Sequence, residues 1–222
     1  MLLLGIAAAP VVLMLLWFYH KDKFQKEPLR MLFYAFLAGC VSIFPAIIIE
    51  FTWQNQGYTQ VGDNYYLAFY AFVVVAFSEE ISKFVFLRRI LNKPYVDEPY
   101  DGILYSVMVS MGFAFVENIF YVFEHGLGVG IMRAFTAIPA HATFAAVMGY
   151  FLGKAKFNGN FIGNTIFGIL GAVLLHGFYD YFLFINNIPL IQLGALLSLI
   201  IGIVLTRSAI RIHNENSPFR TI

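Results

Sequence analysis

Seven apolar segments, each about as long as a helix that crosses a bilayer, follow one another along the chain with only short connections between them. The 222-residue chain is 60% hydrophobic and 12% charged, so it lacks the polar surface that a soluble globular protein of this size needs. We therefore predict an all-α membrane protein, a polytopic bundle of about seven transmembrane helices that forms a single domain over residues 1–222. The expected spans are residues 2–19, 31–51, 65–87, 102–123, 134–153, 161–185 and 189–206.

Basic residues fall almost entirely in alternate connections between these segments. Only Arg133 lies on the opposite side, and Lys83 lies within a span. Because short loops rich in lysine and arginine stay in the cytoplasm, the pattern predicts an amino terminus outside the cell and a carboxyl terminus in the cytoplasm. The basic residues on the expected cytoplasmic side are Lys21, Lys23, Lys26, Arg30, Arg88, Arg89, Lys93, Lys154, Lys156, Arg207, Arg211 and Arg220.

The charge and the cysteine content exclude several classes of partner and site. The net charge is +1 and no basic tract occurs, so we expect no nucleic-acid partner. Cys40 is the single cysteine, which excludes an intrachain disulfide and a cysteine cluster for a metal. The composition points to the lipid bilayer as the surrounding medium.

The third segment carries three charged side chains, Glu79, Glu80 and Lys83, inside an otherwise apolar stretch. Each uncompensated charge near the bilayer centre costs roughly 3 kcal/mol or more, so something must offset that cost. At ~100° per residue, the three side chains form one polar face of a helix. Two crowded carboxylates in a low dielectric favour sharing a proton, and this is the chemistry of a general acid or base. A buried ion cluster that pairs helices or lines an ion path is the alternative.

Each of the three following spans also carries a protonatable group. These are Glu117 with Asn118 in the fourth span, His141 in the fifth, and His176 with Asp180 in the sixth. His176 and Asp180 are four residues apart and share a helix face, so the carboxylate can orient the imidazole or both can face a metal. On the predicted topology these groups lie nearer the external half of the membrane, where they can converge.

The glutamate pair is expected to lie deeper than the histidines. Counting ~1.5 Å per residue from Tyr65 places Glu79 about 21 Å below the outer edge of the membrane. Either the third helix begins above the bilayer, or the site is a tall water-filled cavity.

Taken together, these elements resemble the sequence pattern of PrsW, a bacterial family of intramembrane proteases. That family is itself similar to the type II CAAX prenyl proteases and the bacteriocin-processing enzymes. The likeness extends from the third to the sixth span, and the length and the number of spans are also similar. The elements that carry it are, in order, Glu79-Glu80-Ile81-Ser82-Lys83, Phe113-Ala114-Phe115-Val116-Glu117-Asn118, His141 with the following Gly149, and His176-Gly177-Phe178-Tyr179-Asp180.

The resemblance implies that the protein hydrolyses a peptide bond of a membrane-anchored, single-span substrate and lies in the bacterial cytoplasmic membrane. In PrsW of Gram-positive bacteria the substrate is an anti-sigma factor, cut at its external side as the first of the successive cleavages that free an envelope-stress sigma factor. The positions that match the family's motif residues are Glu79, Glu80, Glu117, His141, His176 and Asp180.

Two differences separate the chain from the CAAX protease relatives. Where those relatives have histidine after the Phe-x-x-x element, this chain has Glu117, and where they often end in asparagine it has Asp180. The mechanism of the relatives is therefore not transferred directly to this chain.

Two mechanisms fit the residues. In the first, a glutamate activates water without a metal, and the histidines with Asn118 stabilise the developing oxyanion. In the second, a divalent ion such as zinc is held by His141, His176 and one of Glu117 or Asp180, while Glu79 or Glu80 takes the proton. We favour the metal because two histidines and several acids supply suitable ligands. Lys83 offsets the charge of the glutamate pair in either case.

Other functions also account for intramembrane acids and histidines. A cation or proton transporter uses a chain of such groups in adjacent spans as a relay. A regulatory membrane scaffold uses a polar cluster only to pair its helices. Transport predicts pH-dependent ion flux in liposomes, whereas a protease predicts that a folded variant lacking Glu80 or His176 no longer cuts its substrate.

Overall fold

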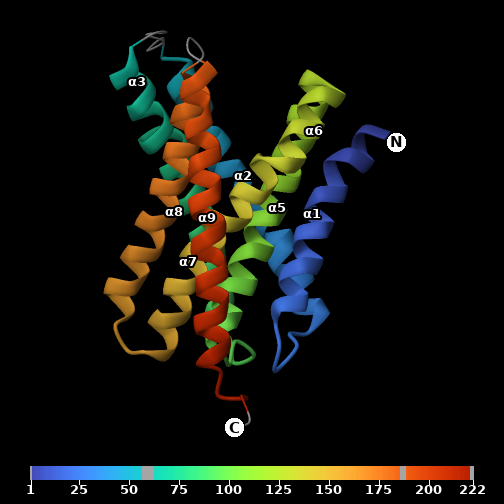
Figure 1. Cartoon of the computed structure of the whole chain (residues 1–222), viewed down its shortest axis with the longest axis vertical. Coiled ribbons are helices and arrows are strands. Elements are labelled where there is room, and N and C mark those ends of the chain that lie inside the picture. The colour runs from blue at the N-terminus through green and yellow to red at the C-terminus, as the bar shows by residue number, and fades with distance from the viewer. Residues whose placement is uncertain (1, 57–62, 186–188, 221–222) are drawn as a thin grey trace.

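The structure, a computed structural model, describes residues 2–56, 63–185 and 189–220, and every regular element within these ranges is a helix. The long helices run along the main axis of an elongated bundle (Figure 1). The amino and carboxyl ends lie at opposite ends of that axis (Figure 1). The elements are α1 (Leu2–Lys21), α2 (Leu29–Gln54), α3 (Asn64–Phe69), the π-helix η1 (Tyr70–Ala76), α4 (Phe77–Leu91), α5 (Pro99–His125), α6 (Leu127–Phe135), α7 (Ala137–Phe157), α8 (Phe161–Phe184) and α9 (Pro189–Glu215).

Six helical stretches in the described part of the chain are long and apolar enough to cross a membrane. The prediction of an all-helical, multi-pass membrane protein is therefore confirmed. The expected third span is not one of the six. It is a continuous helical run in which α3, η1 and α4 follow one another from Asn64 to Leu91, and it carries the buried glutamates and lysine. The six stretches are Leu3–Lys21, Leu29–Gln54, Pro99–His125, Leu127–Phe157, Phe161–Phe184 and Gln192–Glu215.

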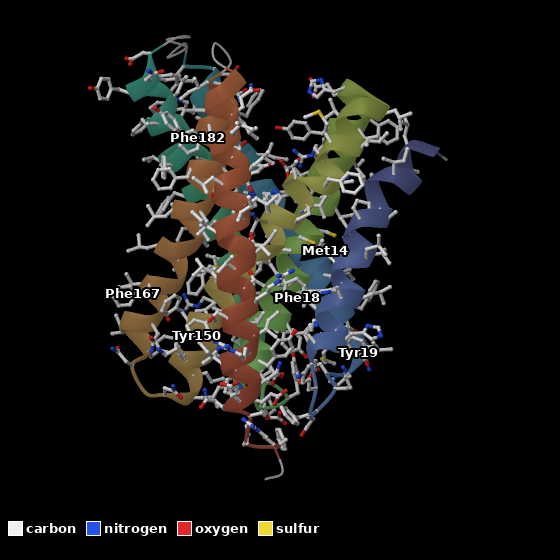
Figure 2. The ribbon with its side chains drawn as sticks, in the orientation of Figure 1. Met14, Phe18, Tyr19, Tyr150, Phe167 and Phe182 are labelled. Carbon is white, nitrogen blue, oxygen red and sulfur yellow. The ribbon has the colours of Figure 1, made fainter. Side chains whose placement is uncertain are left out.

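Large apolar side chains cover the outside of the bundle. Phe33, Ile48, Phe167 and Ile200 are each more than half exposed, and Phe167 points away from the helices in Figure 2. Such a surface is unfavourable in water, but it suits hydrocarbon, where backbone groups are satisfied within each helix and side chains face lipid. The outer face therefore fits a bilayer.

The centre of the bundle is formed by α5 and α7. In the apolar stretches that contain them, Pro99–His125 and Leu127–Phe157, 72% of the residues in the most apolar part are buried. The two helices approach closely where glycines face each other. A Cβ atom added at Gly149 would overlap the backbone of Gly102 and Ile103, so the contact requires the small residue. This close contact fixes α7 against α5 and thereby sets the position of His141, eight residues before Gly149.

Candidate active site

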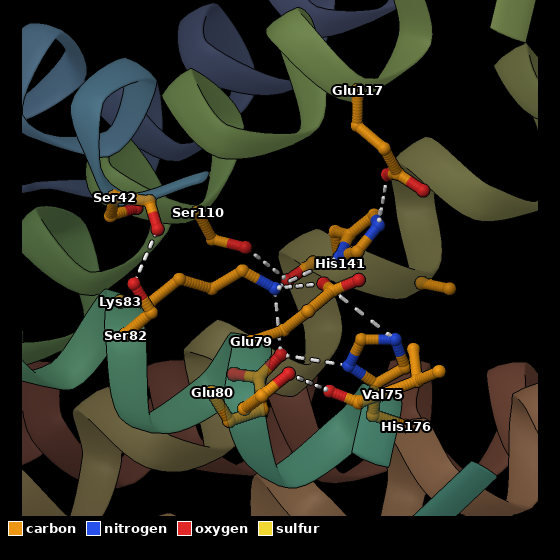
Figure 3. Close-up of polar contacts among 12 residues, drawn as sticks. Ser42, Val75, Glu79, Glu80, Ser82, Lys83, Ser110, Glu117, His141 and His176 are labelled. Atoms are coloured by element: carbon orange, nitrogen blue, oxygen red, sulfur yellow. Dashed lines mark hydrogen bonds and ion pairs between the residues drawn. The ribbon is translucent and has the colours of Figure 1, made fainter. Parts of the chain in front are cut away.

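The charged face of α4 lies inside the bundle. Lys83 Nζ donates hydrogen bonds to Glu79 Oε2 at 3.0 Å and to Glu80 Oε1 at 2.8 Å. All three side chains are 93% or more buried, and Figure 3 shows the lysine reaching across to the carboxylates. The lysine offsets only one of the two carboxylate charges.

Two histidines from different helices contact this group. His176 of α8 places Nδ1 2.9 Å from Glu80 Oε1, and His141 of α7 places Nδ1 3.3 Å from Lys83 Nζ. The two imidazole rings lie 5.2 Å apart and nearly perpendicular to each other. Three helices thus bring two carboxylates, an ammonium and two imidazoles together (Figure 3).

The second ring nitrogen of each histidine faces another carboxylate. His141 Nε2 lies 2.9 Å from Glu117 Oε2, and His176 Nε2 lies 3.2 Å from Asp180 Oδ2. A carboxylate on one ring nitrogen fixes the orientation of the imidazole and leaves the other nitrogen for a different partner. Glu117 and Asp180 are therefore placed to orient the histidines.

Arg133 of α6 is a member of this network that the sequence did not assign. Its Nη2 lies 2.7 Å from Glu117 Oε2, and its Nε donates a hydrogen bond to Asn118 Oδ1 at 3.0 Å. Its guanidinium also stacks over the Tyr121 ring, 4.0 Å from the ring centre. Arg133 is the one basic residue on the expected external side, and this unusual position was a usable sign of a special role. The arginine balances the charge of Glu117.

Asn118 is occupied by structural contacts rather than directed at the cluster. Its amide nitrogen donates to the carbonyl of Ala7 at 3.1 Å, and its oxygen accepts from Arg133. The side chain is fully buried between α5 and α1 and does not line the cavity described below. This position gives no support to its expected role as an oxyanion donor.

The π-helix η1 directly precedes the glutamates. The Phe72 ring packs against Gly177 of α8, where a Cβ atom would overlap the ring carbons, and it meets Phe178 edge-on at 4.9 Å. Gly177 therefore lets η1 approach α8 beside His176, which brings the first turn of α4 within reach of the imidazole. A π-helix within a helical run is rare and frequently marks a functional site.

A cavity of about 800 Å³ borders the cluster. Its walls include Glu79, both histidines, Glu117 and Asp180, whereas Glu80 and Lys83 lie behind them. The cavity reaches the ends of α2 and α8, because Gln54 and Phe184 also line it. The cavity therefore connects Glu79 with one end of the bundle.

Glu50 is the second residue of this region, after Arg133, that the sequence did not assign to the site. It lies on the wall of the cavity with Ile43, Ile47 and Gln54, all from α2. The spacing of these four residues places them on one helix face, so helical periodicity was a usable signal. Because Glu50 lies at the end of the expected span 31–51, where charged side chains are usually solvated, periodicity alone did not place it in the site.

The site has the composition of a metal centre. One ligand atom from each of Glu79, Glu80, His141 and His176 lies within 4.8 Å of the others, and all four residues are buried. Glu80 Oε2 is buried and has no hydrogen-bond partner. Imidazole and carboxylate ligands suit zinc and related divalent ions.

The charge balance points in the same direction. Four carboxylates, from Glu79, Glu80, Glu117 and Asp180, meet two fixed cations, Lys83 and Arg133, within the network. Two negative charges are left over, and either one divalent cation or two protonated histidines would balance them. A divalent metal therefore fits the charge balance as well as the donor set.

Comparison with known proteins identifies the family. The profile of the PrsW family of intramembrane metalloproteases matches residues 27–207. The chain belongs to the PrsW family. No solved structure matches the chain.

Proteins named Protease PrsW from several bacteria are similar to the chain over most of its length. The protein from Geobacillus kaustophilus (strain HTA426) is 37% identical over 186 residues, which are 82% of this chain and 79% of the relative. The protein from Bacillus subtilis (strain 168) is 34% identical over 178 residues, 79% of each chain. That from Clostridioides difficile (strain 630) is 33% identical over 193 residues, 82% of this chain and 79% of the relative.

Membership of the PrsW family confirms the predicted family and the predicted enzyme class. The chain is a membrane-embedded peptidase, and its multi-pass helices imply a membrane-embedded substrate and contact with lipid. The protease interpretation therefore prevails over the transporter and the scaffold. The buried cluster of glutamates and histidines is a group of residues that fits a metalloprotease.

Proposed function

We propose that this PrsW protein hydrolyses a peptide bond of a single-span membrane protein in the cavity beside α4, α7 and α8. The observation that carries the proposal is the convergence of Glu79, Glu80, His141 and His176, whose ligand atoms lie within 4.8 Å of one another. The site includes both an acid–base group and a metal-binding set, and the cavity gives it space for water and a peptide. The proposed catalytic set is Glu79, Glu80, Lys83, Glu117, His141, His176 and Asp180.

The proposed topology has seven spans, an external amino terminus and a cytoplasmic carboxyl terminus. We count the helical run from Asn64 to Leu91 as a seventh crossing beside the six apolar stretches. An odd number agrees with termini at opposite ends (Figure 1). Basic residues of the alternate connections support the orientation. On this topology the cavity reaches the external end.

The proposed metal ligands are Glu80, His141 and His176. Glu80 lies behind the cavity wall with one carboxylate oxygen that has no hydrogen-bond partner, and both histidines line the cavity. This assignment moves Glu117 and Asp180 from ligands to residues that orient the histidines. A divalent ion such as zinc, when bound, supplies Lewis-acid polarisation of the scissile carbonyl and makes water more acidic.

Glu79 is the proposed general base. Its carboxylate lines the cavity, where it can take a proton from the attacking water and pass it to the leaving amine. Lys83 holds that carboxylate in place through the 3.0 Å hydrogen bond. Glu117 and Asp180 orient the imidazoles, and Arg133 balances the charge of Glu117.

The proposed substrate is an anti-sigma factor, cut on its external side in the bacterial cytoplasmic membrane as the first cleavage of an envelope-stress response. The relatives named Protease PrsW come from bacteria, and the family resemblance of the motifs implies this substrate. The cavity supports cleavage on the external side, because a substrate segment that enters from the proposed external end can reach the cluster through it.

Hydrolysis is tested with purified protein and a single-span anti-sigma factor from the same genome, both reconstituted in liposomes. In water enriched in oxygen-18, the proposal predicts one heavy oxygen in the new carboxyl terminus of the product. Glu79→Gln should abolish cleavage while thermal unfolding in detergent shows a folded protein. Glu124→Gln changes an exposed glutamate of α5 in the same way and should cleave normally.

Two results would contradict the proposal. Unchanged cleavage by a folded Glu79→Gln protein would remove the proposed base. Cleavage of no candidate by the wild-type protein, together with pH-driven ion flux in the same liposomes, would favour a transport function.

A further inference from the structure

Five acidic side chains gather at the end of the bundle opposite to the cavity. They lie in the α1–α2 connection, in the α4–α5 connection and in the first turn of α5, near the end of the axis where the chain finishes (Figure 1). About 24 Å of α5 separates Asp101 in this cluster from Glu117 in the active site. The five, which we name the basal acidic cluster, are Asp22, Glu27, Asp97, Glu98 and Asp101.

Three members of the basal acidic cluster have the arrangement of a cation site. One carboxylate oxygen from each of Glu27, Asp97 and Asp101 lies within 4.8 Å of the other two. Glu27 is 3% exposed and Asp101 is fully buried. Carboxylates packed this closely and withdrawn from water repel one another unless a positive charge lies between them.

Several oxygens of the cluster have no protein partner. One buried carboxylate oxygen in each of four residues has no hydrogen-bond partner, namely in Asp22, Asp97, Glu98 and Asp101. Glu98 and Asp101 are fully buried as whole residues. The other oxygen of Asp101 accepts from the backbone nitrogens of Asp97 and Glu98, which fixes the carboxylate in place. A buried carboxylate oxygen without a partner costs free energy, so the unpaired oxygen of the fully buried Asp101 favours a ligand that no other described residue provides.

Two nearby lysines, Lys26 and Lys156, attract carboxylates of the cluster from a distance but form no ion pair with them. Lys26 donates to the carbonyls of Tyr19 and Asp22, and Lys156 donates to the carbonyls of Leu91 and Lys93 at 2.8 and 2.9 Å. In the described ranges of the chain, no lysine or arginine forms an ion pair with any of the five carboxylates. The excess negative charge is therefore left for an ion or for protons.

We propose that Glu27, Asp97 and Asp101 bind a hard divalent cation of the class of Mg²⁺, Mn²⁺ or Ca²⁺ at the base of the bundle. Oxygen-only carboxylate ligands select this class over zinc, which prefers nitrogen and sulfur. The ion joins the α1–α2 connection to the start of α5. Glu98, which accepts a hydrogen bond from Ser217, links the carboxyl-terminal segment to the same place.

Proton binding is the competing explanation for the same geometry. Burial raises the pKa of Glu27 and of Glu98 to about 7, and neighbouring acids add to the rise. The carboxyls of Asp22 and Glu98 are also close enough to hydrogen-bond if one is protonated. Protons and a cation compete for these oxygens, so the experiment is done above pH 7, where the cation has the advantage.

Mn²⁺ is the probe, because its electron paramagnetic resonance signal reports the free ion. The full-length protein in detergent should bind Mn²⁺ saturably, with Mg²⁺ or Ca²⁺ as competitors. Asp97→Asn, at a half-buried position, and Glu27→Gln, which keeps an acceptor for Tyr105, should each weaken this binding roughly tenfold or more. Glu215→Gln, an exposed acid at the same end, is the matched control and should change nothing.

Three results would overturn the proposal. Absence of saturable Mn²⁺ binding to the wild-type protein means that the cluster holds protons alone. Binding that Asp97→Asn and Glu27→Gln leave unchanged means that Mn²⁺ occupies the histidine site instead. A loss in Glu215→Gln equal to that in the two variants means that binding follows surface charge. None of these results involves cleavage, so the proposed proteolysis is tested separately.

Discussion

The ion pair between Arg133 and Glu117 gives a prediction whose size follows from the structure. The charged atoms are 2.7 Å apart, and the two side chains are only 13% and 18% exposed. At an effective dielectric of 20, the attraction at this distance is about 6 kcal/mol before the cost of desolvation is counted. Desolvation removes much of it, and measured couplings between contacting residues reach about 3 kcal/mol. We expect a coupling free energy of about 2 kcal/mol, a factor of about 30 in the unfolding equilibrium.

A double-mutant cycle measures this coupling. Arg133→Met removes the charge and keeps a long side chain, and Glu117→Gln keeps an acceptor for the His141 ring nitrogen. The free energy of unfolding is measured for the wild type, both single variants and the double variant by reversible denaturation in mixed detergent and dodecyl sulfate. Arg133→Met should cost more than Glu117→Gln, because it also removes the stacking on Tyr121.

The reasoning about this pair fails if the two substitutions are additive. A coupling below about 0.5 kcal/mol is what independent sites give. That result would mean that water in the cavity screens the charges, and Arg133 would lose its role in balancing Glu117.

Three further predictions concern other parts of the molecule. In the absence of divalent cations, the stability of the protein should fall as pH rises from about 4.5 to about 7, because burial raises the folded-state pKa of Glu27 and Glu98 above the unfolded value. Glu27→Gln should flatten this dependence when the thermal unfolding temperature is measured against pH. Gly149→Val should destabilise the protein by roughly 3 kcal/mol or more, because the added atoms meet the backbone of α5, whereas Gly128→Ala has open space and should be neutral in the same assay. Asp180→Asn should lower the cleavage rate about 10- to 100-fold while leaving thermal unfolding unchanged, because the residue orients the His176 imidazole.

The helices were predictable because the segment lengths and the apolar composition leave few alternatives in a membrane. The shared faces within one helix were also predictable, since His176 and Asp180 need only the helical repeat to meet. The contact of His176 with Glu80 was not, because it depends on how α4 packs against α8. The sequence pattern predicts which residues share one face of a helix, but it does not predict which other helix packs against that face.

The π-helix shows the same limit in a local feature. Residues Tyr70–Ala76 contain no glycine or proline, and alanines and valines dominate the segment. The widened turns coincide with the packing of Phe72 against Gly177, about a hundred residues later in the chain. A local sequence signal is therefore absent, and the packing partner becomes visible only in three dimensions.

Metal content measured together with cleavage tests the central claim most directly, namely that Glu80, His141 and His176 form one hydrolytic metal centre. We predict one zinc-like transition-metal ion per chain in active protein, quantified by mass spectrometry of the purified sample. Glu80→Gln and His176→Ala should lose the ion and cleavage together while remaining folded, and Glu124→Gln should keep both. Full cleavage by protein that holds no transition metal after thorough chelation would contradict the account.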